Sequence, residues 1–225
     1  KGGLVEDCVI SSNWTGAASG YGGIGYGGGI YMTGGTVSRC VVVSNTVRSS
    51  TSWHDGRGGG IYMTGGTVQN SVIFRNEGPG YGGGVVVAGA GASVLNCTLT
   101  GNTSWNNTGA GLFVSAGAVT NTIIYHNTRV LDGYHVNVNR VGGTMGSCCM
   151  IPLEPGPGNV AAEPDFMDRA AADFHLRPGS ACLDAGTNLA SITMDYAGAV
   201  RPLDGDGTGT SRHDIGAYEE NVPSS

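Results

Sequence analysis

The residues best suited to acid–base chemistry lie together in one short stretch: His54, Asp55 and Arg57. A histidine beside a carboxylate can transfer protons, and an arginine can stabilise developing negative charge. The same three residue types also form solvated turns held by their own hydrogen bonds, and we favour that interpretation. These residues are the best catalytic candidates in the chain, but we predict no catalytic site.

All three tryptophans, and several tyrosines, follow asparagines that recur along the chain. The candidate ligand-binding residues are Trp14, Trp53, Trp105, Tyr21 and Tyr81, and Tyr26 lies in the same set of segments. If these segments emerge along one edge of a rod, their rings could stack on sugar rings or on the apolar surface of a partner. The alternative is that the rings fold back against the protein's own apolar surface.

A third group consists of aspartates near the end of the chain. Asp204, Asp206 and Thr208 alternate with glycines, and Asp214 follows. Closely spaced oxygen ligands with intervening glycines resemble the first half of a calcium loop. The bidentate glutamate expected at the twelfth position is replaced by Ile215, so only Asp214 or Glu219 could complete a site. The sequence requires no cofactor, and calcium is the candidate ion. A plain Asp-Gly turn is the alternative.

The elements that must position these residues are repeated. The eleven residues from Gly27 to Val37 recur without change from Gly58 to Val68, and looser copies begin at Gly82 and Gly109. Each copy ends on an asparagine, which gives the series Asn13, Asn45, Asn76, Asn102 and Asn127, with spacings of 32, 31, 26 and 25 residues. Repeats of this length indicate stacked supersecondary units.

Aligning the asparagines produces unbroken columns of small or apolar residues. They are Ile10, Val42, Ile73, Leu99 and Ile124; Val5, Val37, Val68, Val94 and Val119; and Cys8, Cys40, Ser71, Cys97 and Thr122. Alternation with a period of two predicts short strands that point these columns inward, and the glycine triplets rule out helical repeats. Short strands stacked on their counterparts predict a parallel β-helix. The asparagines are expected to form a buried hydrogen-bonded ladder.

The repeats divide the chain into two parts. We assign residues 1–136 to the coils, and residues 137–225 to the last coil or coils and an irregular C-terminal closing segment packed on the solenoid. Alternation also predicts an outward strip on the coils, consisting of Val41, Val43, Val72, Phe74, Thr98, Thr100, Ile123 and Tyr125. Because most of this strip is apolar, we expect either the closing segment or another chain to cover it.

Composition narrows the classes of partner. The net charge is −6 and Lys1 is the only lysine, which argues against a nucleic-acid partner. No apolar run is long enough for a membrane span. Cys8 and Cys40 occupy neighbouring positions in one inward column, where a disulfide and a pair of buried thiols explain them equally well. Among Cys148, Cys149 and Cys182 we expect a disulfide, which would indicate an oxidising compartment.

Two sets of motifs resemble known families. The stretch from Asp173 to Gly186, together with Asp214 to Glu219, is similar to the segment that closes right-handed β-helix surface proteins of bacteria. Gly28 to Ile30 with Val42 to Asn45, and their copies, resemble the repeats of polymorphic outer-membrane adhesins. Aliphatic residues replace the phenylalanine of the adhesin motif, so that match concerns architecture and carries over no receptor. The resemblance implies an all-β, right-handed parallel β-helix of the pectate-lyase-like type, secreted or exposed at the cell surface.

Enzymes of this architecture that cleave polysaccharides need two or three carboxylates on one face. The outward strip carries none, and the motifs of the pectin hydrolases are absent. We therefore expect an extracellular structural or adhesive module without catalysis, whose partner is a polysaccharide or a surface protein and which is a candidate for self-association. The alternative is a β-helix protein that binds or degrades polysaccharide.

Overall fold

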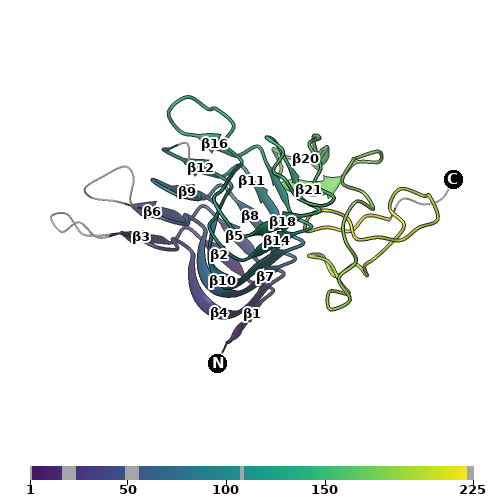
Figure 1. Ribbon diagram of the computed structural model, residues 1–225, viewed down its shortest axis with the longest axis horizontal. Coiled ribbons are helices and arrows are strands. Elements are labelled where there is room, and N and C mark those ends of the chain that lie inside the picture. Colours follow the sequence, from purple (N-terminus) through teal and green to yellow (C-terminus); the bar gives the residue numbers. More distant parts are fainter. Residues whose placement is uncertain (1, 17–23, 49–55, 107–108, 222–225) are drawn as a thin grey trace.

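The computed structural model describes residues 2–16, 24–48, 56–106 and 109–221. The described residues form strands and turns but no helix, and strands from successive repeats stack in parallel in three sheets (Figure 1). The predicted all-β solenoid of stacked parallel strands is therefore confirmed. None of the described segments is a helix that could cross a membrane.

The first and largest sheet contains the longest strands. Along its main path it consists of β1 (Leu4–Glu6), β4 (Ile30–Ser38), β7 (Ile61–Gln69), β10 (Val85–Leu95), β13 (Leu112–Val114) and β17 (Val138–Arg140), and β14 (Ala118–Thr120) and β18 (Thr144–Gly146) extend it beside β10. The repeated sequence sets its register, because Ile30 to Met32 pair with Ile61 to Met63, and Val37 pairs with Val68.

The other two parallel sheets are built from shorter strands. The second contains β2 (Val9–Ser11), β5 (Val41–Val43), β8 (Val72–Phe74), β11 (Thr98–Thr100), β15 (Ile123–Tyr125) and β19 (Cys149–Met150). The third contains β3 (Trp14–Gly16), β6 (Thr46–Arg48), β9 (Glu77–Gly78), β12 (Thr103–Ser104) and β16 (Thr128–Arg129). Five successive coils contribute to all three sheets and the coil of β19 to the first two, so a residue of one coil lies beside its counterpart in the next.

The predicted columns form the inner core. Val42, Ile73, Leu99 and Ile124 are fully buried, and Cys40, Ser71, Cys97 and Thr122 are buried in the neighbouring column. The column residues are exposed only in the N-terminal coil, where Val5 is 42% exposed and Cys8 is also exposed. The inward assignment from period-two alternation is correct wherever a described coil has neighbours on both sides.

The asparagine ladder is confirmed. The Oδ1 atom of Asn76 accepts hydrogen bonds from the backbone N–H and the Nδ2 of Asn45, both at 3.0 Å, and Asn102 does the same for Asn76. The structure adds Asn137 to the series, since its Oδ1 accepts from Asn127. The Nδ2 atoms of four of these asparagines also donate to a carbonyl of the preceding coil: Asn45, Asn76, Asn102 and Asn127.

The glycine triplets turn the chain into the first sheet. Their first members have left-handed φ angles, 63° at Gly27 and 69° at Gly58, which L-residues with a side chain rarely adopt. The second members permit close stacking, because a Cβ on Gly28 would lie 2.2 Å from the carbonyl oxygen of Gly59. Glycine is therefore required at these positions by backbone geometry.

Residues 161–221 form the closing segment, which lies along the outward face of the second sheet (Figure 1). Its regular structure is the antiparallel pair β20 (Phe166–Asp168) and β21 (Asp173–Leu176). Side chains of the coils and of the closing segment pack together in a second core. Its buried members are Val72, Ile123, Tyr125, Cys149, Phe166, Phe174, Leu176, Cys182, Leu183, Ile215 and Ala217. The partner that the outward strip was expected to need is thus the closing segment of the same chain.

The disulfide expected among Cys148, Cys149 and Cys182 is absent, because all six cysteines are thiols in the structure. Cys8 and Cys40 are unbonded as well, and the Cys40 Sγ donates to the carbonyl of Ser38 at 3.2 Å. Cys148 does not face the closing segment, since it continues the inner column below Thr122. Cys148 and Cys149, though adjacent in the chain, therefore belong to different cores.

Candidate functional site

Aromatic residues of successive coils line up on the outer side of the first sheet. Tyr31 of β4 pairs in register with Tyr62 of β7, and the same outward row continues through Val86 to Phe113. A second row runs beside it just before these strands, where Tyr26 bridges Arg57 and Arg57 bridges Tyr81. We call Tyr26, Tyr31, Tyr62, Tyr81 and Phe113, together with Arg57, the aromatic strip.

The rings of the aromatic strip contact one another. Tyr31 and Tyr62 stack with centroids 5.6 Å apart and an interplanar angle of 6°, and Tyr26 meets Tyr62 edge to face at 4.7 Å. Tyr81 meets Phe113 at 4.7 Å. Tyr31 is 56% exposed, whereas Tyr62 is buried beneath its neighbours. The strip therefore presents flat ring surface to solvent on a rigid strand support.

Arg57 belongs to this strip. Its guanidinium carbon lies 5.9 Å from the ring centroid of Tyr26 and 5.3 Å from that of Tyr81, which is cation–π geometry. Its Nε is buried and has no hydrogen-bond partner among the described residues. His54 and Asp55, with which it formed the catalytic candidate, lie outside the described residues.

The predicted tryptophans do not all join the strip. Trp14, on β3 in the third sheet, is 63% exposed with the guanidinium of Arg48 5.3 Å from its ring. Trp105 follows β12, and its Nε1 donates to Glu77 Oε1 at 2.8 Å. Trp53 and Tyr21 lie outside the described residues. Of the five candidate ligand-binding residues, the structure therefore places Tyr81 in a cluster of aromatic side chains.

A groove of about 760 Å³ lies at the far end of the coils, between residues 132–140 and residues 151–154. Its wall includes Tyr134, which is 69% exposed, and the ion pair of Glu154 with Arg140. It also includes Asp132, which pairs with Arg129 outside the groove. Hydrogen bonds from Arg129 and from the backbone of Tyr134 lower the pKa of Asp132 to about 2. A carboxyl with so low a pKa cannot serve as a general acid near neutral pH.

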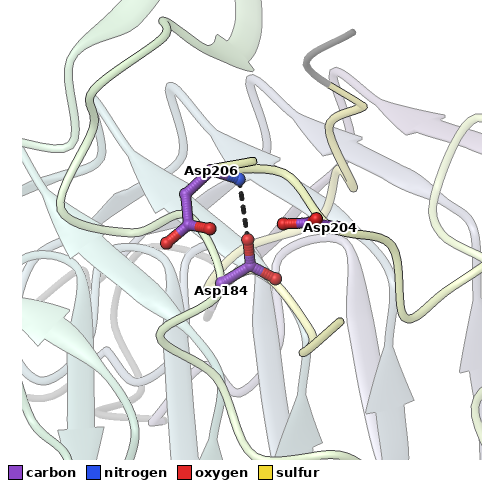
Figure 2. A group of neighbouring side chains, drawn as sticks. All are labelled: Asp184, Asp204 and Asp206. Atoms are coloured by element: carbon purple, nitrogen blue, oxygen red, sulfur yellow. Dashed lines mark hydrogen bonds between the residues drawn. The ribbon is translucent and has the colours of Figure 1, made fainter. Parts of the chain in front are cut away.

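The predicted aspartates are close together, but with a different third member. Asp184, Asp204 and Asp206 each offer a carboxylate oxygen within 4.8 Å of the others (Figure 2). Asp184 is already engaged, because its Oδ2 accepts the backbone N–H of Asp206 and its Oδ1 that of Arg212. Thr208 donates its backbone N–H to Asp206, as in an ordinary Asp-Gly turn.

Asp214, which sequence reasoning added to that group, is not one of the three. Its two oxygens accept the backbone N–H groups of Asp184 and Glu220, both at 2.7 Å. Burial raises the pKa of Asp214 to about 7, against these hydrogen bonds, which lower it. Asp214 therefore holds together the turns of the closing segment.

A further group of acid–base side chains lies in a depression of about 400 Å³ beside β21, lined in part by Asp173, His175 and Glu220. The hydrogen bond with His175 lowers the pKa of Asp173, and burial raises that of Glu220. One carboxyl with a lowered pKa beside another with a raised pKa is a pattern of acid–base sites. Here, however, Glu220 Oε1 accepts the backbone N–H of Leu176 at 3.0 Å, which is a structural role in the closing segment.

Comparison with known proteins gives no functional guide: no family model, curated protein or solved structure matches the chain. Sequence reasoning missed Tyr31 and Tyr62 as surface residues because it treated them only as the alternate positions of strands. Their identity in the two exact repeats was a usable signal. It also missed Tyr134, whose exposure depends on a loop that no repeat predicts.

Proposed function

We propose that this chain is an extracellular structural or adhesive module, non-catalytic, with the right-handed parallel β-helix architecture that its motifs resemble. Its partner is a polysaccharide or a surface protein, bound on the aromatic strip. A helix of stacked coils suits this role because the coil repeat spaces equivalent side chains about 4.8 Å apart along a stiff rod.

The observation that carries the proposal is the exposed ring of Tyr31 stacked on Tyr62. Apolar ring faces stack well on the apolar faces of pyranose sugars and on a partner's apolar side chains. Arg57 is the one charged member of the strip, so recognition by shape and stacking is favoured over recognition of a specific ion.

The alternative of a polysaccharide-degrading enzyme has less support. The carboxyls whose pKa is raised by burial, Asp214, Glu219 and Glu220, lie in the closing segment and accept backbone N–H groups there. Those side chains already have partners within the protein. A polysaccharide-binding role without cleavage remains compatible with the aromatic strip.

Calcium is the ion that the proposal allows, at Asp184, Asp204 and Asp206. These carboxylates are hard oxygen donors of the kind calcium prefers. Its role would be to stabilise the closing segment. Binding assays should therefore be run with and without calcium.

The proposal is tested by electrophoresis of the protein through gels that contain pectin, alginate, carrageenan or xylan. We expect at least one polysaccharide to retard the protein, and Tyr31→Ala to weaken that binding roughly two- to tenfold, because one aromatic stacking contact contributes about 0.5–1.5 kcal/mol. Tyr134→Ala is the matched control, since Tyr134 is also exposed but lies outside the strip.

Equal retardation of the parent and Tyr31→Ala would remove the strip from the binding surface. The same polysaccharides are also assayed for new reducing ends and unsaturated products. Release of such products, abolished by Glu220→Gln, would replace the non-catalytic proposal with the enzymatic alternative.

A further inference from the structure

A small pocket of about 250 Å³ lies where the closing segment meets the second sheet. The ends of β8 and β11 form one wall, and the turn that joins β20 to β21 forms the other. Its lining includes two phenyl rings, a threonine, a glycine and two arginines: Phe74, Phe174, Thr100, Gly101, Arg75 and Arg169. None of these belongs to the aromatic strip, so the two surfaces are separate.

Gly101 leaves this pocket open. It follows β11 in the chain, as Arg75 follows β8 and His126 follows β15, so the three occupy one position of successive coils. All three have left-handed φ angles, which are 53° at Arg75, 62° at Gly101 and 57° at His126. An added Cβ on Gly101 would meet no heavy atom within 4 Å. The coil of Gly101 therefore leaves space where both neighbouring coils carry a side chain.

Thr100 brings a buried hydroxyl to the pocket. Thr100 is 2% exposed, and its Oγ1 has no hydrogen-bond partner in the part of the chain that the structure describes. Thr98, the other threonine of the outward strip, has one, since its Oγ1 accepts the N–H of Ala217 at 3.0 Å. An unpaired buried hydroxyl destabilises the folded state, so its presence in the wall of a pocket points to a group that binds there.

The two arginines supply positive charge. Arg75 holds its guanidinium carbon 5.4 Å from the ring centroid of Phe74, and its Nη2 donates to the carbonyl of Ala170 at 3.4 Å. Arg169 is exposed in the turn between β20 and β21. Within the described ranges, neither arginine forms an ion pair with a carboxylate. Most of their N–H donors are therefore free for a ligand.

The carboxylates that lie close to this turn in the sequence have other partners. Glu163 pairs with His126 at 2.6 Å, and Asp168 accepts the backbone N–H groups of Ala170 and Ala171. Neither carboxylate lines the pocket. In a chain with a net charge of −6, two arginines that share a pocket without an acid are suited to an anionic ligand.

We propose that this pocket binds the carboxylate or sulfate group of an acidic sugar. The guanidinium groups of Arg75 and Arg169 donate to the oxyanion, and the hydroxyl of Thr100 donates to one of its oxygens. The rings of Phe74 and Phe174 give the sugar an apolar wall. Pockets for drug-sized ligands measure about 300–1,000 Å³, so this smaller one holds a single acidic residue of a saccharide.

An acidic peptide fits this place less well than a sugar. Peptides that bind to sheets commonly pair their main chain with a free strand edge. Here β8 is paired on both sides, with β5 and β11, and β11 is paired with β8 and β15. On the side of the coils the pocket therefore offers side chains but no free strand edge.

The test titrates the full chain with trigalacturonate and with a sulfated carrageenan oligosaccharide, by isothermal titration calorimetry at constant ionic strength. We expect at least one of them to bind, and the one that binds identifies the group as carboxylate or sulfate. Arg75→Gln and Arg169→Gln should each weaken the binding about five- to fiftyfold. Arg48→Gln is the matched control, since it removes the same charge from an exposed arginine of the third sheet.

Two further controls separate this pocket from the aromatic strip. Xylotriose has no charged group, so any binding of xylotriose should not change in Arg75→Gln or Arg169→Gln. Tyr31→Ala should leave the affinity of the pocket unchanged. Failure of the pocket and failure of the strip are therefore distinguishable.

Thr100→Val gives a readout that does not depend on charge. Valine keeps nearly the shape of threonine without the hydroxyl, so the unliganded variant should melt at the same or a higher temperature than the parent, while it binds about three- to tenfold more weakly. Thr98→Val should instead lower the melting temperature, because the N–H of Ala217 loses its acceptor. An unchanged affinity in Thr100→Val would contradict the role of the hydroxyl.

The proposal is overturned if neither acidic oligosaccharide binds. Equal weakening by Arg75→Gln and Arg48→Gln would also overturn it, because the anion would then lie elsewhere. Triglutamate serves as the peptide probe. If it binds as tightly as the acidic oligosaccharides, the pocket takes an acidic peptide and not a sugar.

Discussion

Replacing Asn76 with alanine tests the buried asparagine ladder at its centre. Asn76 is fully buried, and its Oδ1 accepts the backbone N–H and the Nδ2 of Asn45. Its Nδ2 donates to the carbonyls of Val42 at 2.8 Å and Phe74 at 3.1 Å, and to Asn102 Oδ1 at 3.0 Å. Alanine can neither accept nor donate any of these bonds.

The expected loss follows from the groups left without partners. The N–H of Asn45 and the carbonyl of Val42 would lose these bonds in the dry interior between coils. Each buried unpaired polar group costs about 1–3 kcal/mol, so the variant should lose roughly 2–6 kcal/mol of unfolding free energy. Since domains are typically stable by about 5–15 kcal/mol, this loss is a large fraction of the total.

Asn13→Ala is the matched control, because Asn13 belongs to the same ladder but is exposed. Its Nδ2 donates to Asn45 Oδ1 at 3.1 Å, and that oxygen still accepts the backbone N–H of residue 13 at 2.9 Å after the change. We expect the control to lose less than about 1 kcal/mol. The assay is urea unfolding followed by circular dichroism, and equal losses in both variants would refute the assignment of a buried ladder.

Two further changes, Phe74→Glu and Asp214→Asn, probe the closing segment, and Val141→Glu is the control for the first. Phe74→Glu should lower the unfolding free energy by about 2–4 kcal/mol in a thermal or urea assay, because the ring packs on Phe174 with centroids 5.4 Å apart. An unchanged stability would show that the second core does not hold the closing segment on the coils. Val141→Glu, at a side chain that is 68% exposed, should change it by less than about 0.5 kcal/mol. The pKa of Asp214 is raised to about 7 in the folded protein, above its unfolded value, so its contribution is complete below pH 4 and is lost as the pH rises to 7. The stability of the parent minus that of Asp214→Asn should therefore fall by up to about 4 kcal/mol over this range, and a difference that does not change with pH would contradict the raised pKa.

The repetitive part of the fold could be predicted in detail from the sequence. Aligning the repeats on their five asparagines predicts that Val42, Ile73 and their column neighbours point inward. This works because each coil repeats both its backbone path and its side-chain direction. The prediction weakens at the N-terminal coil, where the same pattern leaves Val5 exposed. The first described coil has a described neighbour on one side only. A periodic pattern does not show which coil stands at the end of the stack.

The closing segment was less accessible, since its contacts join residues with no common period. Asp184, and not Asp214, lies beside Asp204 and Asp206 in the acidic group, and no repeat of the sequence places residue 184 there. Likewise, the burial of Cys149 and Cys182 in one core depends on how the segment crosses the second sheet. The outward residues of the coils, by contrast, are predictable from the sequence as a surface, because Tyr31 and Tyr62 occupy the same position of two identical repeats.

The closing segment also affects how the solenoid should unfold. In a plain stack each coil contacts only its neighbours, so coils can detach one after another from either end. Here a single segment contacts the coils of Val72, Ile123 and Cys149, and the N–H of Ala217 donates to Thr98 Oγ1 at 3.0 Å. Those coils cannot separate without releasing it, so they should behave as one cooperative unit. The coil of Leu4 and Val9, which the second core does not reach, is then the place where native-state hydrogen exchange begins.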